Sequence, residues 1–190
     1  MTNQTDTTYQ KTKGHGGYRT LKSYQTTTFI YDLTVEFCRT HMTYKTNPSY
    51  RTVDQMIQAA RSGRQNIAEG SQASGTSKKT EIKLVGVARA SLEELLIDYE
   101  DFLRQRGFKL WDKDNPKAKE IRALAYRTDT TYQTYRSYLK SPEEAANAII
   151  CLIHQACYLL DHQLQALEAA FVKMGGFTEN LFKKRLAAKK

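Results

Sequence analysis

The sequence predicts an all-α fold: an antiparallel up-down four-helix bundle with an additional helical insertion between the third and fourth long helices. Breaks between elements are few, because the 190 residues include only 3 Pro and 10 Gly. Apolar residues recur at the helical period in four long segments, and no segment alternates with the two-residue period of a half-buried strand. Helices with one apolar face bury it by packing on one another, which favours a bundle.

Composition divides the chain into three parts. Residues 1–17 are an expected flexible polar arm, residues 18–176 hold the bundle with its insertion at about 107–140, and residues 177–190 are a basic C-terminal helix or tail. The polar N-terminus lacks the apolar stretch of a signal peptide, and no run approaches the ~18 apolar residues of a membrane helix. Three cysteines fit reduced thiols better than a disulfide framework. We therefore expect a cytoplasmic protein that contacts no membrane.

The first two long helices are expected over Tyr18–Met42 and about Tyr50–Glu69, and Pro48 interrupts the chain between them. Apolar residues lie on one side of each helix. Gly70 is placed to be the residue that follows the second helix. Gly63 lies inside that helix at a cost of about 1 kcal/mol in helix propensity, so it indicates close packing or a bend.

The third and fourth long helices are the longest. The third is expected over about Lys78–Arg106, with a broad apolar face. The fourth begins in the capping-box sequence at residues 141–144, which has Pro142 in the first turn, and continues to Met174. The pair Gly175-Gly176 ends it.

Two shorter helical segments accompany the bundle. In the insertion, Asn115 and Pro116 have the pattern of an N-cap and first helical residue, and the following segment keeps an approximate helical period with a break near Asp129. After the fourth helix, residues 178–190 form a short capped basic helix or a frayed tail.

The third and fourth long helices each carry a second set of small or apolar residues away from their main apolar faces. A helix that is apolar on two sides touches another layer or another subunit. We therefore expect a homo-oligomer. The expected interface residues are Gly86, Ala90, Ile97, Leu152 and Leu159.

The formal net charge of +9 is unevenly distributed. Residues 107–140 carry eight basic and four acidic side chains, and residues 177–190 carry five and one. The arm is also basic, whereas the long helices together are near neutral. An anionic partner would therefore meet the arm, the insertion and the tail.

Nucleic acid is the anionic partner we expect, because Lys and Arg neutralise phosphates and tyrosines stack on unpaired bases. Tyr126, Tyr132, Tyr135 and Tyr138 alternate with basic residues in the insertion, although tyrosines at this spacing also line helix contacts. Arg64 falls within an apolar stripe, so it should find an acidic partner or line the lumen of an assembly. The expected nucleic-acid-binding residues are Arg61, Arg64, Lys78, Lys79, Lys83, Arg89, Arg127, Arg136, Lys183, Lys184 and Arg185.

A zinc site is the first alternative. Cys38 and His41 are spaced i, i+3, as are Cys151 and His154, with Cys157 three residues further on. Two helices could in principle supply a Cys₂His₂ set. However, the helical phase places Cys157 on a different side from Cys151 and His154. We therefore expect no metal ligands.

An enzyme is the second alternative, since the third helix is rich in carboxylates. Acidic residues on a helix face are usually solvated, and no Glu-x-x-His pair, phosphate-binding loop or nucleophile elbow occurs. We expect no catalytic residues and no cofactor. The carboxylates are Glu93, Glu94, Asp98, Glu100 and Asp101.

Two segments resemble a known family. RTVDQMIQAARSGRQNIAEGS (51–71) and TSKKTEIKLVGVARASLEELLIDYEDFL (76–103) are similar to the small four-helix bundle proteins first met in intervening sequences of ribosomal RNA genes. The family signature includes Asn66, Glu69 and Gly70. GGYRTLKSYQ (16–25), WDKDNP (111–116) and GGFTENLF (175–182) resemble the subgroup called four helix bundle suffix domain proteins.

The resemblance implies an up-down bundle that oligomerises. A distant relative is the accessory variability determinant of diversity-generating retroelements, a basic pentamer that binds a reverse transcriptase and its RNA. The resemblance therefore implies that the chain forms a homo-pentamer and that RNA and a reverse transcriptase are its partners. Asn66 and Glu69 could instead be structural, bonding the backbone or a neighbouring helix. A protein-protein interaction module without nucleic-acid binding remains the other function.

Overall fold

The computed structural model describes residues 17–42, 50–127 and 130–189, and every regular element within them is helical. The all-α prediction is therefore confirmed for these residues. None of the helices among them is long and apolar enough to cross a membrane. In chain order the elements are the 3₁₀ helix η1 (Gly17–Thr20), α1 (Lys22–His41), α2 (Tyr50–Ala73), α3 (Lys78–Gln105), α4 (Pro116–Leu124), α5 (Tyr132–Arg136), the 3₁₀ helix η2 (Ser137–Lys140), α6 (Pro142–Met174) and α7 (Phe177–Ala187).

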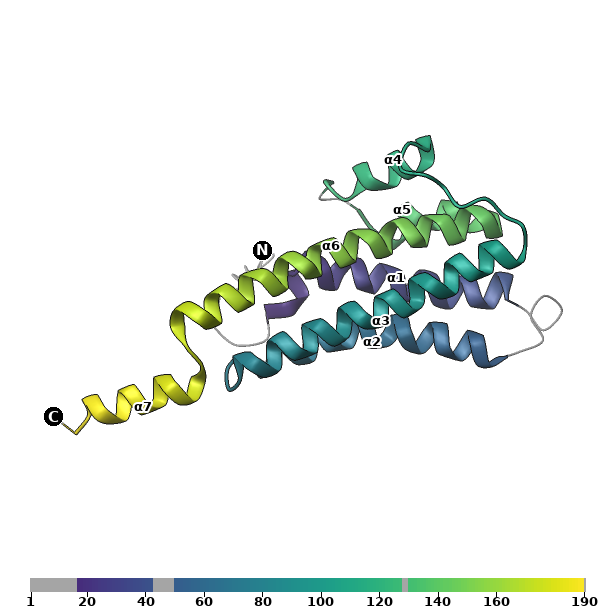
Figure 1. Cartoon of the computed structure of the whole chain (residues 1–190). Coiled ribbons are helices and arrows are strands. Elements are labelled where there is room, and N and C mark those ends of the chain that lie inside the picture. Colours follow the sequence, from purple (N-terminus) through teal and green to yellow (C-terminus); the bar gives the residue numbers. More distant parts are fainter. Residues whose placement is uncertain (1–16, 43–49, 128–129, 190) are drawn as a thin grey trace, which may run out of the picture.

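Four long helices lie side by side, with α4 above α6 and α7 projecting from the end of α6 (Figure 1). Each long helix packs on two others, because α1 and α3 both contact α2 and α6. The apolar faces meet between them. Except for Gly17, the polar arm of residues 1–17 lies outside the described residues.

Aromatic packing links α1 and α3 across the core. The ring of Phe37 lies 5.0 Å from that of Tyr99 and 4.8 Å from that of Phe102, both in edge-to-face contact. The hydroxyl of Tyr99 donates to Thr34 Oγ1 over 3.0 Å. Both hydroxyls are fully buried, so this bond satisfies two polar groups that would otherwise be costly there.

Close approach of α2 and α3 explains two glycines. A Cβ at Gly63 would lie 2.9 Å from Leu92 Cδ2, and one at Gly70 would lie 3.3 Å from the carbonyl oxygen of Glu81. Gly63 therefore reflects close packing. The prediction that Gly70 follows the second helix is wrong, because α2 continues through it to Ala73. Close packing of α2 on α3 favours glycine at this position, so Gly70 does not mark the end of α2.

The helix boundaries are largely as predicted. Asn115 and Ser77 cap α4 and α3, each accepting a bond from a backbone N–H of the first turn. Helix α6 begins at Pro142, but the Ser141 side chain makes no capping bond, so the predicted capping box does not form. Gly175 ends α6 with a φ of 70°, which favours glycine. The first helix starts at Lys22 because a 3₁₀ turn precedes it, and the tail is the helix α7.

Asn147 of α6 holds the beginning of the insertion. Its Oδ1 accepts the Trp111 N–H over 2.7 Å, and its Nδ2 donates to the carbonyl oxygens of Lys109 and Glu143 over 2.9 Å each. The side chain is buried, with 1% exposed. A buried amide with its partners satisfied fixes the chain that it bonds.

Further contacts hold the rest of the insertion on the bundle. Gln155 of α6 donates to the Ile121 carbonyl at 3.3 Å, and His41 Nε2 of α1 lies 2.8 Å from the Leu139 carbonyl. The insertion thus covers the N-terminal half of α6. The second layer predicted from the two-sided apolar pattern of α6 comes here from the same chain.

Replacing Asn147 should loosen the insertion. Asn147→Ala leaves the Trp111 N–H and the Lys109 carbonyl without their partner, at about 1–3 kcal/mol in the free energy of unfolding. Urea denaturation measures the loss, and limited proteolysis should cut faster between α3 and α4. Asn180→Ala, on the exposed surface of α7, is the control and should change stability by less than about 0.5 kcal/mol. Equal stability of the two variants would contradict this role for Asn147.

Candidate nucleic-acid interface

Several of the predicted cations lie in ion pairs. Arg89 Nη1 lies 2.7 Å from Glu93, and its Nε lies 3.2 Å from Asp161 of α6. Lys78 pairs with Glu81 and Arg136 with Glu36. An incoming phosphate would have to displace these carboxylates. These three cations are therefore less available than their charge suggests.

The other predicted cations of the bundle have different surroundings. The Arg64 guanidinium lies 4.3 Å from the centre of the Tyr31 ring, a cation-π contact between α2 and α1. Burial raises the pKa of nearby Asp32, and the charge of Arg64 partly opposes that shift. Arg64 thus finds partners inside its own chain. Among the predicted cations of the bundle, Arg61, Lys79 and Lys83 are exposed.

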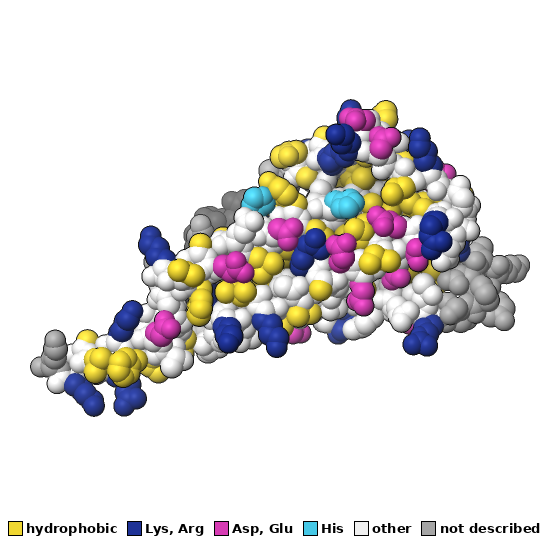
Figure 2. Space-filling model, viewed as in Figure 1, with side chains coloured by type: hydrophobic (Ala, Val, Ile, Leu, Met, Phe, Trp, Pro, Cys, Tyr) yellow, Lys and Arg dark blue, Asp and Glu magenta, His cyan; other side chains and the backbone are white. Residues whose placement is uncertain are grey.

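Helix α7 carries three adjacent predicted cations. Lys183, Lys184 and Arg185 are exposed, and no described carboxylate lies within ion-pair distance of them. The helix projects away from the bundle, and basic and hydrophobic side chains lie together on it (Figures 1 and 2). The exposed hydrophobic side chains of α7 are Phe177, Leu181, Phe182 and Leu186.

A cavity of about 620 Å³ lies between α1, the insertion and α6. Helical spacing explains two of its walls, because side chains at i, i+3, i+4 and i+7 share one face. The α1 wall is Lys22, Gln25, Thr26 and Phe29, and the α6 wall is Cys151, His154, Gln155, Tyr158 and Leu159.

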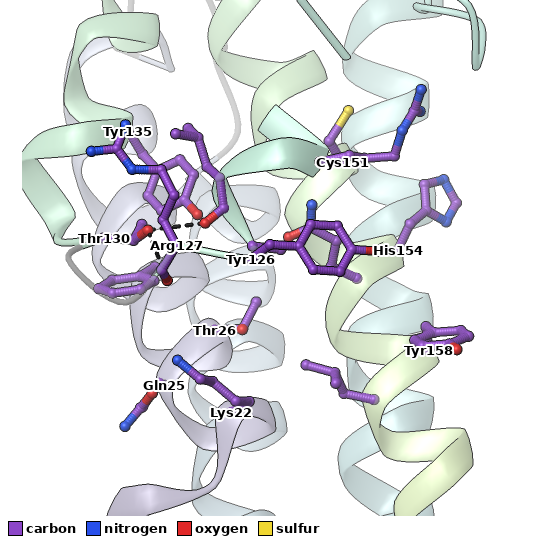
Figure 3. A pocket seen from close by; sticks show the side chains of 16 residues that line it. Lys22, Gln25, Thr26, Tyr126, Arg127, Thr130, Tyr135, Cys151, His154 and Tyr158 are labelled. Atoms are coloured by element: carbon purple, nitrogen blue, oxygen red, sulfur yellow. Dashed lines mark hydrogen bonds between the residues drawn. The ribbon is translucent and has the colours of Figure 1, made fainter. Parts of the chain in front are cut away.

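The turn after α4 forms the third wall. The Thr130 hydroxyl donates to the Leu124 carbonyl over 3.0 Å and closes this turn. Tyr126 and Arg127, both in the turn, line the cavity. In Figure 3, Tyr126 lies between the labelled residues of α1 and those of α6.

Basic side chains reach the cavity from all three walls. They are Lys22 of α1, Arg122 and Arg127 of the insertion, and His154 of α6. None of the described lining residues is Asp or Glu. Because all the charged side chains on its described walls are basic, the cavity attracts anions.

Aromatic rings lie at two depths. Tyr135 is 3% exposed and packs 5.6 Å from Phe29, and burial raises its pKa. Tyr126 is 90% exposed and Tyr158 is 64% exposed. Aromatic side chains usually bury most of their surface. Tyr126 therefore presents an exposed ring to a ligand. The Tyr158 ring contacts that of His162 edge to face at 4.3 Å but stays largely exposed.

The cavity was not predicted from the sequence, although signals for it exist. Of the predicted nucleic-acid-binding residues, Arg127 alone lines it, and the alternation of tyrosines with basic residues had singled out Tyr126 and Tyr135. Lys22, Arg122 and His154 were missed. The helical phase of Cys151 and His154 puts them off the main apolar face of α6. The side of α6 that carries them lines the cavity.

The predicted interface residues fall in three environments. On α3, a Cβ at Gly86 would meet no atom within 4 Å, Ala90 is exposed and Ile97 is 52% exposed, so this stripe has no partner within the described chain. Leu159 lines the cavity. Leu152 is fully buried by its own chain and offers no surface to a second copy.

The family-signature residues have local packing contacts. Asn66 Nδ2 donates to the Ser62 carbonyl and hydroxyl oxygens, and Ser62 Oγ lies 2.9 Å from Ser91 Oγ of α3. Asn66 thus supports the contact between α2 and α3, the structural alternative raised from the sequence. Glu69 is exposed.

The other candidate groups lie apart from the cavity or from one another. Burial and the nearby charges of Glu94 and Asp101 raise the pKa of Asp98 on the outer side of α3. Burial raises the pKa of Cys38 to about 12 and that of Cys157 to about 11. Within the described residues no group of three or more His, Cys, Asp or Glu could hold a metal ion.

Cys151 should be the most reactive thiol of the folded protein. It is half-buried beside the cavity, whereas Cys38 and Cys157 are buried. Burial raises the pKa of Cys151 above 9.0, with Arg122 partly opposing the shift. Because the thiolate reacts, its alkylation rate should rise about tenfold per pH unit and reach no plateau below pH 9. Iodoacetamide labelling with peptide mass spectrometry measures the alkylation rate of each cysteine. Faster labelling of Cys38 or Cys157 than of Cys151 would contradict the prediction.

Comparison with known protein families, curated proteins and solved structures finds no match. Membership of the four-helix bundle family therefore stays a prediction.

Proposed function

We propose that this protein is a non-enzymatic, homo-oligomeric scaffold that binds RNA, and that its four long helices form an up-down bundle of the kind predicted. The observation that carries the proposal is the contrast between its cations. Arg89 is neutralised by carboxylates of its own chain, whereas Lys183, Lys184 and Arg185 are exposed and pair with no carboxylate among the residues that the structure describes. Unpaired cations on a projecting helix are suited to phosphate.

Self-association is supported by the outer face of α3. Ile97 and Val87 are exposed apolar side chains, and Gly86 and Ala90 leave room for close approach. Small residues let two helices approach closely, and an apolar side chain between them gains from burial. A second copy of α3 is the simplest occupant of this face. The resemblance adds the proposal that the RNA belongs to a reverse transcriptase that the scaffold assists.

The second candidate is a protein-protein interaction module without nucleic-acid binding. The exposed apolar side chains of α7 favour it, because burying Leu181 or Phe182 on a partner would contribute about 1.5–3 kcal/mol each. Retention of RNA distinguishes the two candidates.

Neutralising α7 should weaken RNA binding and its salt dependence. For single strands the slope of log K against log salt changes by about 0.7 for each phosphate contact, so Lys183→Gln, Lys184→Gln and Arg185→Gln together should reduce it by about 2. Filter binding from about 50 to about 200 mM salt measures the slopes, because affinities that depend on phosphate contacts fall strongly over this range.

The matched control removes three charges that already have partners. Lys117, Lys119 and Arg104 pair with Glu144, Asp114 and Asp101, so the triple Gln variant at these positions should keep most of the slope. Equal losses in the two variants would contradict the role of α7. An absence of RNA retention by the wild type would leave the interaction module.

A charge on the α3 face should break the oligomer without unfolding the chain. Ile97→Asp changes an exposed residue, so monomer stability should shift by about 0.5 kcal/mol or less, while the mass from light scattering should fall. Val172→Asp, at an 85% exposed site on α6, should keep the wild-type mass. A wild type that is monomeric at all concentrations would contradict the proposal.

A further inference from the structure

The cavity between α1, the insertion and α6 has the size of a small-molecule site. Its volume of about 620 Å³ lies within the range of about 300–1,000 Å³ typical of ligand pockets. The apolar side chains of Phe29, Leu124 and Leu159 line it together with polar and charged ones. This combination is suited to a ligand with a flat apolar part and a charged part.

The charged part must be an anion. Lys22 of α1, His154 of α6 and Arg122 of the insertion line the cavity on three sides. Arg122 donates one of its N–H groups to the Lys113 carbonyl, which orients the guanidinium and leaves further donors. An arginine forks onto phosphate oxygens, and a lysine adds a point charge.

The flat part meets aromatic rings. Tyr126 and Tyr158 are more exposed than the other tyrosines whose exposure the structure describes, and both line this cavity. Stacking of a base on an aromatic ring contributes about 1–3 kcal/mol. Gln25 and Gln155 also line the cavity, and their amide oxygens can accept bonds from base edges. The Gln25 Nε2 donates to the Arg19 carbonyl over 3.1 Å. Gln155 uses only its Nε2 in bonding the Ile121 carbonyl.

We propose that this cavity binds one unpaired nucleotide, with its base on the rings of Tyr126 and Tyr158 and its phosphate at Lys22 and Arg122. The nucleotide belongs to a single strand of RNA or is a free mononucleotide, since both present the same base and phosphate. In its RNA form the inference rests on the proposed function. A duplex does not fit, because its bases stay paired and stacked inside the A-form helix.

The test uses the full chain and four probes: adenosine monophosphate, inorganic phosphate, a 12-nucleotide single-stranded oligoadenylate and a 12-base-pair RNA duplex. Isothermal titration measures affinity, and the alkylation rate of Cys151 reports occupancy, because this thiol lines the cavity. The monophosphate should bind and slow alkylation of Cys151. The single strand should bind more tightly than the duplex.

Variants at the exposed rings locate the binding. Tyr126→Ala and Tyr158→Ala should each weaken binding of the monophosphate about tenfold, since loss of one stacking partner is expected to have this effect. Phe182→Ala removes an exposed ring of α7, outside the cavity, and should leave this affinity unchanged. Circular dichroism melting shows that each variant is folded.

The outcomes separate the cavity from the proposed function. Equal binding of single strand and duplex, with no effect of Tyr126→Ala, would overturn the cavity site and leave RNA binding by α7. Binding of the monophosphate without either RNA would support the cavity and overturn the proposed function. Phosphate alone protecting Cys151 as well as the monophosphate does would overturn recognition of the base. Binding of no probe would overturn both.

Discussion

The hydrogen bonds of Asn147 are the constraint on which the candidate site depends. Asn147 lies on the long helix α6. Its side chain bonds the backbone of Lys109 and Trp111, between α3 and α4, where the insertion begins. Once that point is fixed, α4 lies along α6 and the turn after α4 comes to face α1. The contacts of Gln155 with Ile121 and of His41 with Leu139 hold the rest of the insertion, which supplies the third wall of the cavity. A single buried polar side chain thereby links the packing of α6 to the geometry of a surface site.

Helical periodicity predicts the long helices because each must bury one apolar face, and the caps Asn115 and Ser77 and the stop at Gly175 follow from backbone chemistry near each residue. The role of Gly70 could not be predicted from local sequence. Glycine is favoured there because α2 packs closely on the backbone of α3 at Glu81, 11 residues later in the chain. The cavity was beyond prediction for the same reason. Its residues come from three segments, and only the fold of the insertion brings Lys22, Arg122 and His154 to one place.

The ion pairs in the structure show which basic side chains already have a carboxylate partner in the same chain. The sequence shows a surplus of +9, and the structure divides it into cations that hold the bundle and cations that face outward. Arg89 and Arg136 link elements of the same chain through Asp161 and Glu36. The exposed cations Lys183, Lys184 and Arg185 of α7 pair with no carboxylate of the described residues, and Lys22 lines the cavity. In the proposed arrangement α7 would attract the strand over a long distance, and the cavity would select an unpaired nucleotide at short range.

Hydrogen-deuterium exchange of the full chain, with and without single-stranded oligoadenylate, tests the central claim most directly. If the insertion and the bundle together form the binding site, RNA should slow exchange in the turn at residues 122–127 and in α6 around residues 151–159, while α2 stays unchanged. Slower exchange in α7 alone, or none near the insertion, would contradict the account.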